Sequence, residues 1–163
     1  MHYLCKMKKI INLYNSLVDE TNIFSYNQLS DIESELKERN ITIGGGCVIG
    51  TGCTIDNGVS IASNVEIGDN TIITEGTAIY GCCVIGYDCI IGYNSIINHN
   101  VQIGDACVIG TSVLIRNGCK IGNGVIIYDD CFIGSNVIIG DQCVIYQETS
   151  VEAYCEIEAG RKI

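Results

Sequence analysis

Isoleucine recurs at every sixth position from Ile43 to the last residue, Ile163, and this period constrains the fold more than any other feature of the chain. One position of the series differs, and it holds the similar residue Val151. A helical period of 3.6 residues or a strand period of 2 does not stay in phase over such a length. A hexapeptide period is typical of a parallel β-helix, so the sequence predicts an all-β solenoid over residues 43–163.

We call the residues of this series rungs, and the residue two positions before each rung its slot. Slots are small or β-branched, and because side chains alternate along a strand, rung and slot point together into a core. Two and three residues after the rungs come pairs such as Asn57-Gly58 and Asn117-Gly118, which suit a left-handed corner. Each unit is therefore a strand and a corner, and three units close one triangular coil, stacked about 4.8 Å from the next.

This pattern resembles the bacterial hexapeptide-repeat acyltransferases, with the sugar O- and N-acetyltransferases nearest. The resemblance covers about three quarters of the chain. It implies a left-handed coil, acetyl-CoA as co-substrate and a homotrimer, none of which follows from the period alone.

Eleven cysteines would by number suggest disulfides or a metal site. Nine of them occupy slots, where cysteine packs as a small buried hydrophobe: Cys47, Cys53, Cys83, Cys89, Cys107, Cys119, Cys131, Cys143 and Cys155. Metal binding needs clustered ligands with histidine or CxxC spacing, and because neither occurs we expect no metal. So many reduced thiols indicate a reducing compartment, and Cys82, on a corner, and Cys5 are the expected reactive thiols.

The formal net charge is −10, and the repeat carries thirteen acidic residues against Arg116, Lys120, Arg161 and Lys162. An acidic surface without a basic stripe argues against nucleic acid and anionic membrane as partners. No apolar run approaches the roughly 18 residues of a membrane span, and no signal peptide is evident. We therefore expect a cytoplasmic protein.

Residues 1–42 form a separate N-terminal segment without the six-residue phase. The apolar residues within 6–19 have roughly helical spacing, and residues 30–33 match a capping box that opens a second helix through about Arg39, with Asn40 as its stop. We expect this helical segment to cover the open edge of the first coil. The alternative is an arm that contacts substrate or a neighbouring subunit.

The residues just before the rungs face outward, and on two of the three walls they are apolar. They include Ile72, Ile90 and Val108 on one wall, and Ile96 and Leu114 on another. A stripe of this length is too large to leave in water and indicates an oligomer interface. The family resemblance makes that oligomer a homotrimer.

His99 lies on a corner halfway along the ladder. Its surroundings, NHNVQIGD at 98–105, are similar to the segment that bears the catalytic histidine in several hexapeptide acyltransferases. The resemblance implies that His99 is the general base of acyl transfer, a role that suits an imidazole. The alternative is a solvated corner histidine, and the acidic residue that some relatives place after the histidine is Asn100 here.

The same resemblance implies direct transfer from acetyl-CoA without a covalent enzyme intermediate. Asn98, Asn100 or the backbone N–H of Gly104 contributed by a neighbouring subunit are candidates to hold the oxyanion. We expect Arg116, one coil above Asn98, to bind a CoA phosphate or an acceptor carboxylate. The alternative is a surface ion pair with an acidic neighbour. Three further positions, stacked above His99 or after the next rung, are the candidate cofactor-binding residues: Asn117, Ser135 and Gly104.

The predicted function is thus a CoA-dependent acyltransferase, an acetyltransferase that acts on a hydroxyl or amine of a sugar or small amino compound. A serine acetyltransferase-like enzyme is one alternative, although the glycine-threonine-glycine stretch of that family is absent after the histidine. A non-catalytic β-helical scaffold is the other. Turnover of acetyl-CoA separates enzyme from scaffold.

Overall fold

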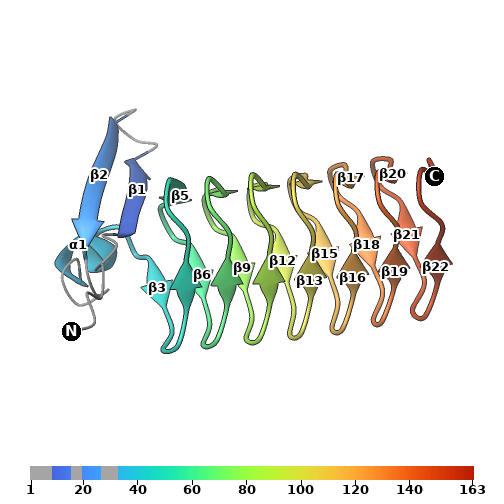
Figure 1. Ribbon diagram of the computed structural model, residues 1–163, viewed down its shortest axis with the longest axis horizontal. Coiled ribbons are helices and arrows are strands. Elements are labelled where there is room, and N and C mark those ends of the chain that lie inside the picture. Colours follow the sequence, from blue (N-terminus) through green and yellow to red (C-terminus); the bar gives the residue numbers. More distant parts are fainter. Residues whose placement is uncertain (1–8, 16–19, 27–32) are drawn as a thin grey trace, which may run out of the picture.

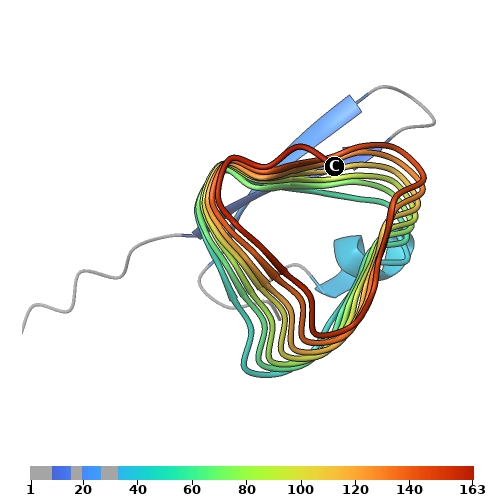
Figure 2. The same cartoon turned by 90° about the vertical axis from the view of Figure 1, so that its right-hand side faces the viewer.

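The computed structural model describes residues 9–15, 20–26 and 33–163. Its main body is a stack of triangular coils, with two strands and a helix at the N-terminal end (Figure 1). Viewed from the C-terminal end, the chain winds clockwise as it approaches the viewer, so the coil is left-handed (Figure 2). The prediction of a left-handed parallel β-helix is confirmed.

Three parallel sheets, here called A, B and C, form the walls of the triangle. In the coils, sheet A contains β5 (Cys53–Asp56), β8 (Ile72–Ile73), β11 (Ile90–Ile91), β14 (Val108–Ile109), β17 (Ile126–Ile127) and β20 (Val144–Ile145). Two strands of the N-terminal segment, β1 (Lys9–Asn15) and the antiparallel β2 (Glu20–Tyr26), extend this sheet beyond β5. Sheet B contains β3 (Thr42–Ile43), β6 (Ser60–Ile61), β9 (Ala78–Ile79), β12 (Ile96–Ile97), β15 (Leu114–Ile115), β18 (Phe132–Ile133) and β21 (Ser150–Val151). Sheet C contains β4 (Val48–Ile49), β7 (Glu66–Ile67), β10 (Val84–Ile85), β13 (Gln102–Ile103), β16 (Lys120–Ile121), β19 (Ile138–Ile139) and β22 (Glu156–Ile157).

The rungs form the core. Each strand pairs with the strand 18 residues further on, so that Ile97, for example, lies between Ile79 and Ile115 of the neighbouring coils. Every rung from Ile49 to Val151 is at most 5% exposed. Because burial of isoleucine side chains is the main favourable term in folding, this column stabilises each coil through its neighbours.

The third residue after each rung makes the corner. From position 46 to position 160 every one of these residues has a positive φ, for example 59° at Asn100 and 72° at Gly118. The predicted left-handed corners are therefore confirmed, and the fold also imposes this conformation on residues that adopt it less readily, such as Cys82 and Ala106.

The polar slot side chains donate hydrogen bonds as well as filling space. Cys119 Sγ lies 3.0 Å from the carbonyl oxygen of Gly134, and Ser95 Oγ lies 2.7 Å from that of Gly110. The same contact, to the carbonyl 15 residues on, recurs at the other polar slots from Cys47 to Cys143. Burial raises the pKa of the Cys119 thiol, which keeps it protonated and able to donate. Packing, the role assigned from sequence, is thus only part of what these cysteines do.

Glycines directly after the rungs leave room for the next coil. A Cβ on Gly50 would lie 2.5 Å from both the backbone nitrogen and Oδ1 of Asp69. That Oδ1 accepts a hydrogen bond from the N–H of Thr51 at 2.6 Å. Equivalent side-chain contacts to the preceding coil are made by Asp105, Asn123, Asp129 and Asp141. Coil stacking therefore accounts for these glycines.

The N-terminal segment departs from the sequence-based expectation. A helix is predicted within residues 6–19, but the described part, Lys9–Asn15, is strand β1. It pairs in parallel with β5 and antiparallel with β2 (Glu20–Tyr26). The edge of β5 presents backbone groups that a strand can pair with and a helix cannot, so the helix prediction is wrong here. The β-branched Ile10 and Ile11 also favour a strand.

The second predicted helix is present as α1 (Glu33–Glu38). The N–H of Ile41 donates to the Leu36 carbonyl at 2.8 Å and that of Asn40 to the Lys37 carbonyl at 3.1 Å, with Asn40 at φ 54°. This Schellman motif confirms Asn40 as the stop. Leu36 and Ile41 are buried, so α1 closes the core at the first coil. Ser30 of the capping box lies outside the described residues.

Two cysteines are less buried than predicted. Cys155 is exposed, because no described coil covers its slot, and Cys47 in the first full coil is half-buried. Cys82 is exposed on its corner, as predicted. Cys5 lies outside the described residues.

Candidate active site

His99 is exposed on the corner that joins β12 of sheet B to β13 of sheet C. Its carbonyl oxygen accepts a hydrogen bond from the N–H of Gly118 at 3.0 Å. The N–H of Asn98 donates to the following coil at 2.9 Å, and that of Asn100 to the preceding coil at 3.2 Å. Both neighbouring coils thus fix the backbone from which these three side chains project.

Tyr80, on the preceding coil, contacts His99. The two ring centroids are 5.2 Å apart and the ring planes are inclined by 55°. Sequence reasoning missed this residue, which lies 19 positions before His99. The contact could have been predicted, because one coil is 18 residues long and residues 19 positions apart are therefore diagonal neighbours on adjacent coils.

Arg116, Asn117 and Ser135 lie on the following coils of the same edge, as predicted. The carbonyl oxygens of Asn117 and Ser135 accept N–H hydrogen bonds from the next coil at 2.8 and 2.9 Å, which keeps the coils in register above His99. The guanidinium carbon of Arg116 lies 5.9 Å from the centroid of the Phe132 ring. This cation–π contact holds the arginine beside the corner.

Gly104 is placed away from these residues. It lies on the next corner, between sheets C and A, at the other end of the strand that follows His99. Its N–H donates to the Ile121 carbonyl at 2.9 Å, and its carbonyl accepts from Cys89 Sγ at 3.1 Å. The space beside its Cα is taken by Asn123. The structure therefore uses both polar backbone groups of Gly104 within the chain.

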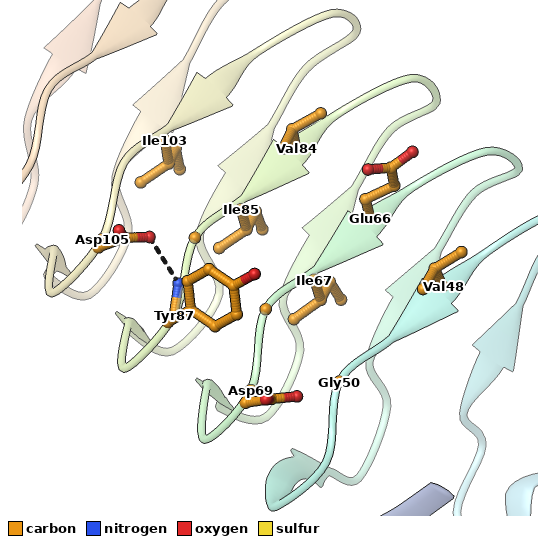
Figure 3. Close-up of a pocket in the computed structure, with 12 residues that line it drawn as sticks. Val48, Gly50, Glu66, Ile67, Asp69, Val84, Ile85, Tyr87, Ile103 and Asp105 are labelled. Carbon is orange, nitrogen blue, oxygen red and sulfur yellow. Dashed lines mark hydrogen bonds between the residues drawn. The ribbon is translucent and has the colours of Figure 1, made fainter. Parts of the chain in front are cut away.

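A groove of about 410 Å³ runs along the outer face of sheet C. The outward side chains of Val48, Glu66 and Val84 form a row along three consecutive strands of this face (Figure 3). Tyr87 and Asp105 line it at the corner toward sheet A, where Asp105 Oδ1 accepts a hydrogen bond from the N–H of Tyr87 at 3.0 Å. The coil that carries His99 at one edge of sheet C thus carries Asp105 at the other.

Acidic and basic side chains lie at different places along the face of sheet C. The groove is lined by Glu66, Asp69 and Asp105, and none of its lining residues is basic. Past the His99 coil, the outward residue is Lys120, with Arg116 on the neighbouring edge. The groove therefore favours neutral or cationic ligands, and the neighbourhood of Lys120 and Arg116 favours anionic groups.

Asp56 is a buried carboxyl outside this site. It is 4% exposed, and burial, followed by the charge of Glu75, raises its pKa from 3.8 to about 6. In the described part of the chain, no donor meets its Oδ1. Among the described residues, no group of three or more His, Cys, Asp or Glu side chains is arranged to hold a metal ion. The described residues also include no helix with the length and apolar character needed to cross a membrane.

Two family models match the ladder. The bacterial transferase hexapeptide (six repeats) matches residues 46–81. The hexapeptide repeat of succinyl-transferase matches residues 83–113, 110–129 and 126–146. Together they match more than half of the chain. No curated protein sequence matches it.

Three solved structures illustrate the likeness in fold. A Bacillus cereus protein named as a candidate acetyltransferase is 23% identical, with a TM-score of 0.68 over 74% of this chain and 73% of the other. A UDP-N-acetylglucosamine acyltransferase from Bacteroides fragilis is 23% identical, with a TM-score of 0.57 over 76% and 63%. A GDP-perosamine N-acetyltransferase from Caulobacter crescentus, a histidine-to-alanine mutant with CoA and GDP-perosamine bound, is 14% identical, with a TM-score of 0.52 over 82% and 59%.

At these identities the similar structures show the fold alone, and the chain spans less than two thirds of the second and third. Both family models describe the hexapeptide repeat. In this chain the rungs, slots and corners of that repeat build sheets A, B and C. The chain therefore belongs to the hexapeptide-repeat transferase family.

Proposed function

We propose that this protein is a CoA-dependent acyltransferase that moves an acetyl group from acetyl-CoA to a hydroxyl or amine of a sugar or small amino compound, with His99 as its general base. The observation that carries the proposal is the exposed imidazole on a rigid corner beside sheet C, whose outer face is grooved. Family membership adds support, as does the binding of CoA and GDP-perosamine by the similar Caulobacter crescentus enzyme.

The chemistry is a direct transfer. A nitrogen of neutral His99 takes the proton from the acceptor hydroxyl or amine as that atom bonds to the thioester carbonyl carbon. The carbon–sulfur bond then breaks, and the CoA thiolate leaves and takes up the proton. The side-chain amides of Asn98 and Asn100 are the donors we assign to the oxyanion, in preference to the N–H of Gly104, which is engaged in the ladder.

The charge pattern of sheet C supports an assignment of the two substrates. The acidic groove disfavours the phosphates of CoA, so we place the acceptor there. CoA then lies on the far side of His99, where Arg116 and Lys120 attract its phosphates, and Asn117 and Ser135 contact its pantetheine arm. An anionic acceptor, such as one that carries a nucleoside diphosphate, fits this acidic groove less well than a neutral or amine-bearing acceptor.

We propose that the active form is a homotrimer. The outward side chains of sheet A include Ile72, Ile90 and Val108, each between 36% and 40% exposed, and Ile96 on sheet B is similar. Apolar residues aligned along consecutive coils form a continuous surface that association would bury.

The test is acetyl transfer from acetyl-CoA to a panel of acceptors, measured by release of free CoA. His99→Ala should lower kcat by about 100-fold or more, the usual worth of general base catalysis. Arg116→Ala should instead weaken CoA binding, because one charge partner of the phosphates is lost. Gln147→Ala, at the equivalent position of an exposed corner on another edge, is the matched control and should keep full activity.

Two outcomes contradict the proposal. If His99→Ala retains full activity, the base lies elsewhere. If the unmutated protein binds no CoA by calorimetry, the chain is a scaffold and not a transferase.

A further inference from the structure

The ring of Tyr80 is the side chain that the structure brings against the His99 imidazole. Tyr80 directly follows β9 and lies one coil before His99. A centroid separation of 5.2 Å with the planes inclined by 55° is a tilted aromatic contact, within the range in which such pairs attract. Both rings are at the surface, so burial in a core does not impose this pairing.

Gly81 provides the other side of the contact. A Cβ built on Gly81 would lie 3.7 Å from Nδ1 of His99 and 3.1 Å from the carbonyl oxygen of Ser63. The imidazole therefore leans back over the preceding coil, with Nδ1 as the ring atom that comes within 4 Å of this point. Nε2 does not come within 4 Å of this point.

The glycine at position 81 is not explained by its backbone conformation. Gly81 is absent from the residues with positive φ, so an ordinary side chain would be compatible with its backbone. On the same edge, the equivalent positions of the next coils carry the side chains of Asn117 and Ser135. The space that the missing side chain leaves is the space over which the His99 ring lies.

We propose that Tyr80 and Gly81 form a seat that holds the imidazole of His99 in one orientation, with Nε2 presented to the substrate. Tyr80 is then a positioning residue, and its importance for catalysis rests on the proposed role of His99 as base. An exposed histidine on a corner is otherwise free to change rotamer. Fixing the ring matters, because a misplaced base can cost about 100-fold in rate.

The seat is tested first without reference to activity. The chain has only two histidines, so the NMR signals of the His99 ring are assigned by comparison with His99→Ala. In Tyr80→Ala the ring protons of His99 should lose the ring-current shift imposed by Tyr80, whereas Tyr80→Phe should keep it. Tyr93→Ala removes a tyrosine of similar exposure, 45% against 42%, from a different corner and should leave these signals in place.

Activity is the second readout. Tyr80→Ala should lower kcat by about 10-fold with little change in KM, Tyr80→Phe should restore it, and the melting temperature should match that of Tyr93→Ala. A larger side chain in Gly81→Val should displace the ring and give the same loss of kcat. Unchanged His99 signals in Tyr80→Ala would overturn the seat, and moved signals with unchanged kcat in an active enzyme would overturn its positioning role. If wild type shows no transfer but the signals move, the seat holds and the proposed function fails.

Discussion

Replacing Cys119 by valine isolates the contribution of one slot hydrogen bond. Cys119 is fully buried, and its thiol lies 3.0 Å from the carbonyl oxygen of Gly134, itself a buried residue. Valine occupies the equivalent slots Val101 and Val125, so its shape fits this position. The substitution therefore removes a donor while keeping the packing. A buried acceptor left without a partner costs about 1–3 kcal/mol, and because a thiol is a weak donor we expect a loss of about 1–2 kcal/mol.

Cys131→Val is the matched control. Its thiol makes the same contact at 3.0 Å, but to the carbonyl oxygen of Tyr146, an exposed residue. Water can replace the lost donor there, so we expect a loss below about 0.5 kcal/mol. Cys119→Ser keeps a donor, as Ser95 does naturally at 2.7 Å from Gly110, and should lose less than Cys119→Val.

Urea unfolding followed by circular dichroism measures the difference. With a slope of about 2 kcal/mol per molar urea, the predicted loss for Cys119→Val lowers the midpoint by about 0.5–1 M, well above the error of the measurement. An unchanged or higher midpoint for Cys119→Val would refute the reasoning. So would an equal loss in Cys131→Val, because it would show that the loss does not come from leaving a buried acceptor without a partner.

Three further predictions test other parts of the structure. Among the described cysteines, Cys82 and Cys155 should react rapidly with a thiol reagent in native protein, and mass spectrometry that finds most slot cysteines labelled as fast would contradict the packing. Because the folded-state pKa of Asp56 is raised to about 6, its protonated form favours folding. Stability should therefore fall as pH rises from about 4 through about 6, and Asp56→Asn should flatten that dependence in unfolding titrations. Replacing Ile90 and Val108 by aspartate should give monomers or aggregates by sedimentation, since it puts unpaired charge in the proposed interface, whereas a monomeric wild type would disprove the trimer.

The ladder could be predicted from sequence almost residue by residue. The rungs, the slots and the corners are local features repeated every six residues, and stacking every 18 residues turns each into a column. The core and the position of His99, Arg116, Asn117 and Ser135 on one edge follow from that arithmetic. An error at one unit would have been contradicted by the next, which is why the prediction held over the whole ladder.

The ends of the solenoid could not be predicted in this way. Whether Lys9–Asn15 is a helix or a strand depends on the unpaired edge of β5, which no local pattern describes. The exposure of Cys155 likewise depends on its neighbours in space, because no described residues stack on its slot. At both places the described structure lacks a neighbouring coil with the equivalent position, so the repeat pattern does not predict the contacts.

The six-residue period by itself determined the parallel β-helix and its core, because both depend only on contacts between equivalent positions of adjacent coils. The left hand of the coil was an expectation from the family resemblance, and the corners were predicted from the Asn and Gly residues two and three positions after the rungs. Only the tertiary structure decided the contacts between positions that are not equivalent. The thiol of Cys119 reaches Gly134 across 15 residues, and Tyr80 reaches His99 across 19. Such diagonal contacts depend on the direction in which each side chain leaves its coil, which hydrophobic periodicity does not encode.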